Sequence, residues 1–279
     1  MTTYLLPFEK MHGTGNDFIF LDKRHLPNNV NEKLLAKELC NRHFGIGADG
    51  LIIVDFSTTS DVDFAWNYYN SDGSEAEMCG NGMRCFAKYV FERGLTDKES
   101  FSVLTKAGVI KPALEADGTV TVNMGSPKIP AKLTENLTIE KNEINYTYIE
   151  IGNPHCVIFS NNEISELDFF TLGPIIEKHK KFPKGVNVEF VKVLNKNKIK
   201  CKVWERGAGA TLACGTGACA VLIAASVNNF TDDSAKVCLP GGSLLVRWDK
   251  VTNYVYLNGP ASFVYTGHFN LDPALVYKK

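Results

Sequence analysis

The feature that most constrains this chain is an internal repeat with a spacing of 135 residues, the difference between positions 79 and 214. Cys79 begins Cys-Gly-Asn-Gly, and Cys214 begins Cys-Gly-Thr-Gly. At the same spacing, Asn123 corresponds to Asn258. Matches that recur in order along half a chain predict a duplication. We therefore expect two similar lobes related by a pseudo-two-fold axis, with a functional site in the cleft between them.

The expected secondary structure agrees with a duplication. Short runs rich in β-branched and aromatic residues, bounded by Gly, Asn and Asp, predict strands. They are 18–21, 51–55, 64–69, 101–104 and 120–123 in the first half, and 146–151, 156–159, 186–193, 199–204, 244–248 and 254–257 in the second. After Cys79 apolar residues follow a helical period as far as Gly94, a predicted C-cap. After Cys214 the run 218–227 is apolar on every face, which is typical of a buried helix.

The predicted fold class is therefore α+β, with two pseudo-symmetric lobes. Each lobe is expected to be a mixed sheet wrapped around a central helix that begins at a cysteine. The first lobe would comprise residues 1–122, completed by 261–279, and the second lobe residues 123–260.

The composition excludes several classes of protein. Hydrophobic residues make up 44% of the 279 residues and the net charge is −1, which disfavours a nucleic-acid or acidic-membrane binder. We expect no membrane span and no export signal, so the eight cysteines are predicted to be reduced thiols in the cytoplasm. Because neither CxxC nor HExxH occurs, no metal site is predicted.

Cys79 and Cys214 are the candidate catalytic residues. Each would lie at the N-terminus of a helix, where free amides and the helix dipole are expected to lower the thiol pKa from about 8.5. The other six cysteines are interpreted as small buried apolar residues. Two thiols facing one carbon would allow a thiolate to remove a proton from one side while a thiol returns a proton to the other, inverting the centre.

One further motif is rejected as a functional site. Residues 45–50 read Gly-Ile-Gly-Ala-Asp-Gly, which is formally a dinucleotide-binding fingerprint. That fingerprint requires a strand before it and a helix after it. Here residues 34–40 predict a helix before the motif and 51–55 predict a strand after it, so we predict no nucleotide cofactor.

Several motifs taken together resemble the diaminopimelate epimerase family over nearly the whole chain. They are Met11-His-Gly-Thr-Gly-Asn-Asp-Phe, Asn70-Ser-Asp-Gly-Ser-Glu, Cys79-Gly-Asn-Gly-Met-Arg-Cys, Gly152-Asn-Pro-His-Cys, Trp204-Glu-Arg-Gly-Ala-Gly, Ala213-Cys-Gly-Thr-Gly and Leu239-Pro-Gly-Gly-Ser. The resemblance implies a cofactor-independent epimerase of lysine and cell-wall precursor synthesis that interconverts LL- and meso-2,6-diaminopimelate. It also implies two lobes with barrel-like sheets, and a homodimer with Tyr265 as a contact.

The resemblance also assigns roles to individual residues. Cys79 and Cys214 would be the acid–base pair. The amides of Gly80, Asn81, Gly215 and Thr216 would hold the reacting carboxylate. The distal end of the substrate would be bound by Asn16, Asn70, Asn153, Asn187, Glu205 and Arg206. His155 and Glu205 would adjust the thiol pKa values. Some relatives carry Gln where this chain has Gly50, so we do not count Gly50 as a ligand.

Simpler interpretations of these residues remain open. Asn16, Asn153 and Asn187 are also typical of turns. Arg206 beside Glu205 is also typical of a surface ion pair, and His155 of a buried structural histidine.

Two other functions also remain open. One is a relative in the proline-racemase branch, which uses the same two-thiol chemistry on another amino acid. The other is a thiol redox or small-ligand binding protein in which Cys79 and Cys214 form a disulfide.

Overall fold

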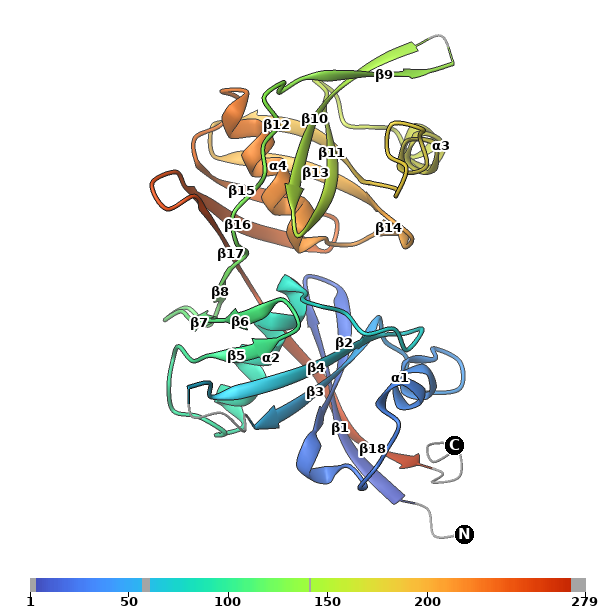
Figure 1. Cartoon of the computed structure of the whole chain (residues 1–279), viewed down its shortest axis with the longest axis vertical. Helices are drawn as coiled ribbons and strands as arrows, with labels where there is room; N and C mark the ends of the chain where they lie inside the picture. The colour runs from blue at the N-terminus through green and yellow to red at the C-terminus, as the bar shows by residue number, and fades with distance from the viewer. Residues whose placement is uncertain (1–3, 57–60, 141, 272–279) are drawn as a thin grey trace. The chain divides into compact units, whose positions relative to one another are not determined.

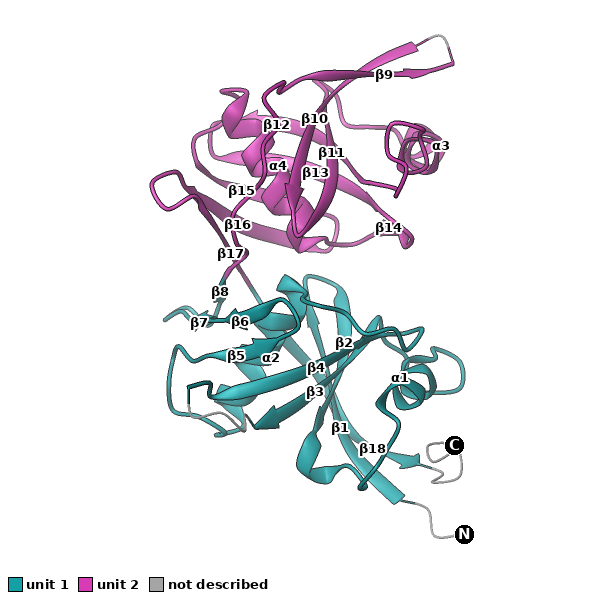
Figure 2. Cartoon of the chain, in the orientation of Figure 1, with its two compact units in different colours: residues 1–122, 260–279 teal, residues 123–259 magenta. Residues whose placement is uncertain are grey.

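The computed structural model describes residues 4–56, 61–140 and 142–271 (Figure 1). The chain divides into two compact units, residues 1–122 with 260–279 and residues 123–259 (Figure 2). The predicted lobes differ from these units by one residue, since Pro260 belongs with the first unit. There the Arg84 Nε donates a hydrogen bond to the Pro260 carbonyl oxygen at 3.2 Å. Residues 272–279 of the predicted first lobe lie outside the described residues.

Unit 1 contains a mixed seven-stranded sheet that curls around helix α2 (Gly80–Glu92), with helix α1 (Glu32–Cys40) on the outer side (Figure 1). In spatial order the strands are β18 (Ser262–Leu271), β1 (Tyr4–Gly13), β2 (Asn16–Asp22), β3 (Gly50–Phe56), β4 (Phe64–Asn70), β5 (Val103–Thr105) and β6 (Gly108–Ile110). A short hairpin follows, formed by β7 (Ala113–Leu114) and β8 (Val120–Asn123).

Unit 2 repeats this plan around helix α4 (Gly215–Val227), with helix α3 (Glu166–Glu177) on the outer side (Figure 1). In spatial order its strands are β17 (Tyr254–Gly259), β16 (Gly242–Asp249), β15 (Ser234–Leu239), β13 (Lys198–Glu205), β12 (Asn187–Asn195), β11 (Asn153–Phe159), β10 (Asn142–Ile151) and β9 (Glu135–Ile139). The short β14 (Gly209–Thr211) pairs with β13.

The strand directions repeat in the same order in both units. From β1 to β6 the neighbouring pairs are antiparallel, parallel, antiparallel, parallel and antiparallel. The path β10, β11, β12, β13, β15, β16 has the same five relations. This confirms the predicted fold of two related lobes.

The two central helices confirm the repeat in detail. Both are 13 residues long, and they begin 135 positions apart, at Gly80 and Gly215. Cys79 and Cys214 are their N-caps, as predicted. Arg93 is the C-cap of helix α2, and Gly94 follows with a φ of +65°, the left-handed geometry that glycine adopts most readily. Helix α4 is buried on every face and fills the core of unit 2.

The predicted strands occur, and the structure adds elements that the sequence patterns did not indicate. Helix α3 is the clearest, since it contains Gly173 and Pro174, which usually interrupt helices. Its N-cap Ser165 accepts a hydrogen bond from the Asp168 amide. A Cβ on Gly173 would lie 2.7 Å from the Trp204 ring, so the glycine allows α3 to approach the sheet closely. Tertiary packing therefore outweighs local preference here.

In the described part of the chain, every helix is too short or too polar to cross a membrane. The segment 45–50 follows α1 and leads into β3, which begins at Gly50; this is the reverse of the order that a dinucleotide site requires.

Candidate functional site

The two predicted catalytic cysteines occupy equivalent places in their units. The Gly82 amide donates to Cys79 Sγ at 3.5 Å, and the Gly217 amide donates to Cys214 Sγ at 3.3 Å. Each sulfur therefore caps the first turn of a central helix. The free amides and positive dipole of such a turn attract a carboxylate.

Unit 1 brings three of the predicted residues together at the start of α2. The Cys79 thiol donates to Asn16 Oδ1 at 3.6 Å, and Asn81 Nδ2 donates to the same oxygen at 3.2 Å. Asn16 Nδ2 in turn donates to Asp49 Oδ2 at 2.8 Å. Asn16 is thus oriented by the protein beside a half-buried sulfur.

Asn70 lies at the end of β4, opposite Gly50 in the neighbouring strand. Its side-chain amide donates to Ser74 Oγ at 3.0 Å. A Cβ on Gly50 would lie 2.6 Å from the Tyr68 ring and 2.9 Å from the Tyr69 carbonyl oxygen. This backbone therefore leaves no room for a larger side chain at position 50.

In unit 2, Cys214 is almost fully buried, at 6% exposure. Thr216 Oγ1 lies 3.4 Å from its sulfur, and the Glu205 side chain is close enough to affect the pKa of the thiol. Glu205 Oε1 accepts a hydrogen bond from Thr211 Oγ1 at 2.5 Å.

The prediction of a lowered thiol pKa is wrong for Cys214. Burial raises the pKa of this thiol well above its ordinary value, and the carboxyl groups of Glu205 and Glu189 raise it further. The helix amide and Thr216 act in the opposite direction but do not compensate. Cys214 is therefore a protonated thiol near neutral pH, the form in which a cysteine acts as an acid.

A buried His–Glu pair lies on β11 and β12, two neighbouring parallel strands that pack against α4. His155 Nδ1 and Glu189 Oε1 are 2.6 Å apart, and both side chains are fully buried. Burial raises the pKa of Glu189, while the histidine acts against that rise. His155 was predicted to lie at the site; Glu189 was not.

The remaining residues predicted to bind the distal end of the substrate gather in unit 2. Arg206 and Asn153 both line a pocket of about 720 Å³. Asn187 Oδ1 accepts from the Arg206 backbone amide at 2.9 Å, and its Nδ2 donates to the Pro154 carbonyl oxygen at 2.9 Å. The Asn187 side chain, 2% exposed, therefore holds the arginine turn in place.

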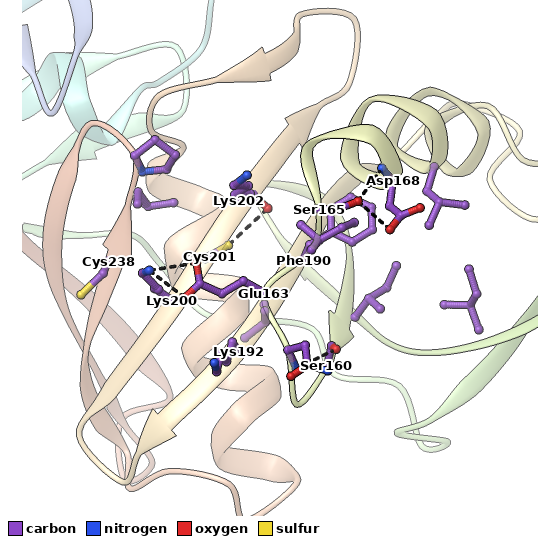
Figure 3. Close-up of a pocket in the computed structure, with 18 residues that line it drawn as sticks. Ser160, Glu163, Ser165, Asp168, Phe190, Lys192, Lys200, Cys201, Lys202 and Cys238 are labelled. Carbon is purple, nitrogen blue, oxygen red and sulfur yellow. Dashed lines mark hydrogen bonds and ion pairs between the residues drawn. The ribbon is translucent and has the colours of Figure 1, made fainter.

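A second pocket in unit 2 contains none of the predicted site residues. It has a volume of about 660 Å³ and is lined by residues of α3, β12, β13 and β15, among them Asp168, Lys192, Lys200 and Cys238 (Figure 3). Lys200 is occupied by two contacts to the Glu163 carboxylate, at 2.8 and 2.9 Å.

The cysteines outside the two N-caps are mostly buried. None of the eight described cysteines is in a disulfide, and Cys40, Cys85, Cys156, Cys201 and Cys219 are buried, whereas Cys238 is only half-buried. Within residues 4–56, 61–140 and 142–271, no cluster of His, Cys, Asp and Glu side chains has the arrangement of a metal site.

Sequence reasoning missed Glu189 and Arg84. Glu189 lies in the apolar run Val186-Asn-Val-Glu-Phe-Val, and an acidic residue on the inward face of such a strand is a signal worth noting. Arg84 is fully buried in α2 and contacts the Pro260 carbonyl and Thr14. Its position inside the cysteine motif gave no sign of burial.

Comparisons with known proteins point to one family over most of the chain. The family model "Diaminopimelate epimerase" matches residues 8–130 and 147–264. A diaminopimelate epimerase from Desulforapulum autotrophicum is 46% identical, over 95% of this chain and 99% of the relative. Another, from a Synechococcus strain, is 44% identical over 94% of this chain and 97% of the relative.

Solved structures with the same fold are more distant in sequence. A hydroxyproline epimerase from Agrobacterium vitis has a TM-score of 0.72 at 16% identity, over 97% of this chain and 94% of that one. A PhzF-family protein from Bacillus anthracis has a TM-score of 0.71 at 16% identity, over 97% and 100%. With the family model and the closely matched relatives, these findings show that the chain belongs to the diaminopimelate epimerase family.

Proposed function

We propose that this protein interconverts LL- and meso-2,6-diaminopimelate without a cofactor, within lysine and cell-wall precursor synthesis. The observation that carries the proposal is the repeated cysteine N-cap, one on the central helix of each unit, in a member of this family. A single carbon placed between two such caps would meet an acid on one side and a base on the other.

The first step is removal of the α-proton. The Cys79 thiolate takes the proton as the C–H bond breaks, and the electron pair stays on the substrate carbon and its carboxylate. The amides of Gly80, Asn81, Gly215 and Thr216 stabilise this negative charge, because helix N-termini carry partial positive charge. The position of these residues in the first turns of α2 and α4 supports the assignment.

The second step returns a proton to the opposite face. The Cys214 thiol donates its proton, a new C–H bond forms, and its sulfur becomes the thiolate. The net result is an inverted centre and a pair of sulfurs that have exchanged protonation states. The raised pKa of Cys214 supports its role as the acid in this direction, and Glu205, which contributes to that rise, is assigned to tuning it.

The far end of the substrate carries a second ammonium and a second carboxylate. The guanidinium of Arg206 suits the carboxylate, since it offers planar paired donors. Asn153 Oδ1 is buried and has no hydrogen-bond partner among the described residues, so it is available to accept from the ammonium. Both residues line the same pocket of unit 2, which favours a long open-chain substrate over a compact ring.

Turnover in heavy water tests the two-base mechanism. The epimerised product should carry deuterium at the inverted carbon, while recovered substrate remains largely unlabelled at early times. Equal early labelling of product and substrate would instead indicate one base that serves both faces.

Substrate comparison tests the assignment against the proline-racemase alternative. Steady-state rates with LL-diaminopimelate, proline and hydroxyproline should show turnover of diaminopimelate alone. Turnover restricted to proline would overturn the proposed substrate and leave the two-thiol chemistry intact.

We further propose a cytoplasmic homodimer. Cysteines in the thiol form support a reducing compartment. Strand β18 is an edge strand of the sheet of unit 1, and its Val264 and Tyr265 are 53% and 46% exposed. An exposed apolar edge strand is suited to pairing with another chain. Sedimentation velocity should give twice the chain mass of 30.8 kDa, and Tyr265→Glu should shift the protein toward monomer.

A further inference from the structure

Glu189 is a carboxyl group in the core of unit 2. It lies on β12, between Asn187 and Val191 on the strand face that is directed toward α4. Its side chain has no solvent exposure. An ionisable group in such a place is costly to bury, so its partners indicate what it does there.

The carboxyl group of Glu189 connects His155 with the first turn of α4. One of its oxygens, Oε1, is 2.6 Å from His155 Nδ1. A Cβ built on Gly217 would lie 2.9 Å from this same oxygen and 3.2 Å from Cys214 Sγ. One added carbon would thus touch both the carboxylate and the sulfur, so the two groups lie beside the same side of Gly217.

The Glu189–His155 pair does not use all of its hydrogen-bonding atoms. Neither Glu189 Oε2 nor His155 Nε2 has a hydrogen-bond partner in the described part of the chain. A purely structural ion pair would be expected to have its remaining polar atoms bonded, since unpaired buried polar atoms are unfavourable. A carboxyl group with an unpaired oxygen, beside the same glycine as the Cys214 sulfur, is placed to act on the charge of that sulfur.

We propose that Glu189 is a positioning residue that sets the protonation state of Cys214, acting through its place against the first turn of α4 and its hydrogen bond to His155. The ionised carboxylate accepts the Nδ1–H of His155, which fixes the imidazole with a lone pair on Nε2. The carboxylate also disfavours a thiolate on Cys214. The catalytic consequence rests on the proposed function, but the effect on the thiol does not.

Two carboxyl groups act on the sulfur, Glu205 on β13 and Glu189 on β12, and the amide end of α4 acts in the opposite direction. His155 on β11 is bonded to Glu189 and also acts on Glu205. Glu189 also acts on two buried thiols, Cys156 and Cys201, and both have raised pKa values, mainly through burial. Of the two carboxyl groups that act on Cys214, only Glu189 is bonded to the histidine.

The test is the pH dependence of Cys214 alkylation in the full-length protein without substrate. Iodoacetamide reacts with the thiolate, and mass spectrometry of the Cys214 peptide separates this site from the other seven cysteines. Glu189→Gln removes the negative charge but keeps an oxygen that accepts from His155. We expect its alkylation profile to move to lower pH, with labelling about tenfold faster at neutral pH.

Glu177→Gln is the matched control. Glu177 is another buried carboxyl group of unit 2, held by Trp204 Nε1 and the Gly207 amide, both at 2.9 Å. This variant should label Cys214 as the wild type does. An unchanged profile in Glu189→Gln, or an equal shift in Glu177→Gln, would overturn the proposal.

A measurement on the wild type keeps the proposal testable if Glu189→Gln fails to fold. Histidine-selective ¹⁵N NMR should show His155 protonated on Nδ1, with a downfield proton typical of a short buried hydrogen bond. A neutral His155 protonated on Nε2 would contradict the proposed arrangement. Both measurements are made without substrate, so they remain informative even if the proposed epimerisation proves wrong.

Discussion

At the scale of single residues, Cys79 and Cys214 share the same N-cap position but have different surroundings. Both sulfurs cap a 13-residue helix and accept a glycine amide. Cys79 is half-buried beside the side-chain amides of Asn16 and Asn81, whereas Cys214 is buried beside carboxyl groups. Neutral amides tolerate a thiolate better than carboxylates do, so the two sulfurs are suited to opposite roles.

Replacing either cysteine tests these roles. Cys79→Ala and Cys214→Ala should each lose epimerisation by about 10²–10⁴-fold or more, because general acid–base catalysis contributes that much. Cys238→Ala is the control, since this half-buried thiol lines the other pocket of unit 2. Full activity in either of the first two variants, measured by kcat/KM, would remove that cysteine from the mechanism.

A second prediction at this scale concerns acid stability. Burial raises the pKa of Asp17, but hydrogen bonds and charge attraction from Arg42 and Lys10 outweigh it and lower the pKa from 3.8 to about 2. A carboxyl group with a lowered folded-state pKa stabilises the fold above its unfolded pKa, and that contribution is lost as the pH falls through the folded value. The contribution of Asp17 should therefore disappear between about pH 4 and pH 2.

The test is the free energy of unfolding of Asp17→Asn against pH. Near neutral pH the variant should be less stable by about 2 kcal/mol, and the difference from wild type should shrink as the pH falls to 2. Asp232→Asn, which changes an exposed carboxylate, should follow the wild type. A constant difference between Asp17→Asn and wild type at every pH would contradict the assignment.

At the scale of elements, the central helices both build the core and carry the reactive groups. Helix α4 is apolar on every face because the sheet of unit 2 surrounds it, and the outer helices α1 and α3 cover the other sides of the sheets. The thiol at the start of α4 is therefore anchored by a fully buried helix, which limits its movement relative to the strands that carry His155 and Glu205.

Core substitution in α4 tests how much this helix stabilises the fold. Ile223 is fully buried, so Ile223→Ala should lower the free energy of unfolding by about 2–5 kcal/mol, through lost apolar burial and the cavity that remains. Val251 is 96% exposed, and Val251→Ala should change it by less than about 0.5 kcal/mol. Urea unfolding monitored by circular dichroism compares the two, and equal effects would argue against a core role for α4.

At the scale of the whole molecule, the duplication divides the proposed chemistry between two units. Each unit contributes one cysteine-capped helix, and the chain passes between the units at residues 122–123 and 259–260. The proposed reaction needs a thiol and a thiolate together, so neither unit is sufficient alone.

Oxidation tests whether the two sulfurs work together. A Cys79–Cys214 disulfide should abolish epimerisation, since bonded sulfurs carry no protons, and a reducing thiol should restore it. Oxidation of Cys238→Ala should give the same reversible loss. Activity that survives complete, peptide-mapped cross-linking would show that the pair is not the acid–base couple.

The sequence by itself determined the duplication, the strands and helix starts, and the positions of both cysteines. These depend on patterns within a few residues, such as side-chain period, caps and glycines. Only the tertiary structure decided the protonation of Cys214, the use of Asn187 to hold Arg206, and the pairing of Glu189 with His155. Glu189 and His155 lie 34 positions apart and meet because β11 and β12 are parallel neighbours. Burial and charge at such a point depend on strands distant in sequence, so no local pattern records them.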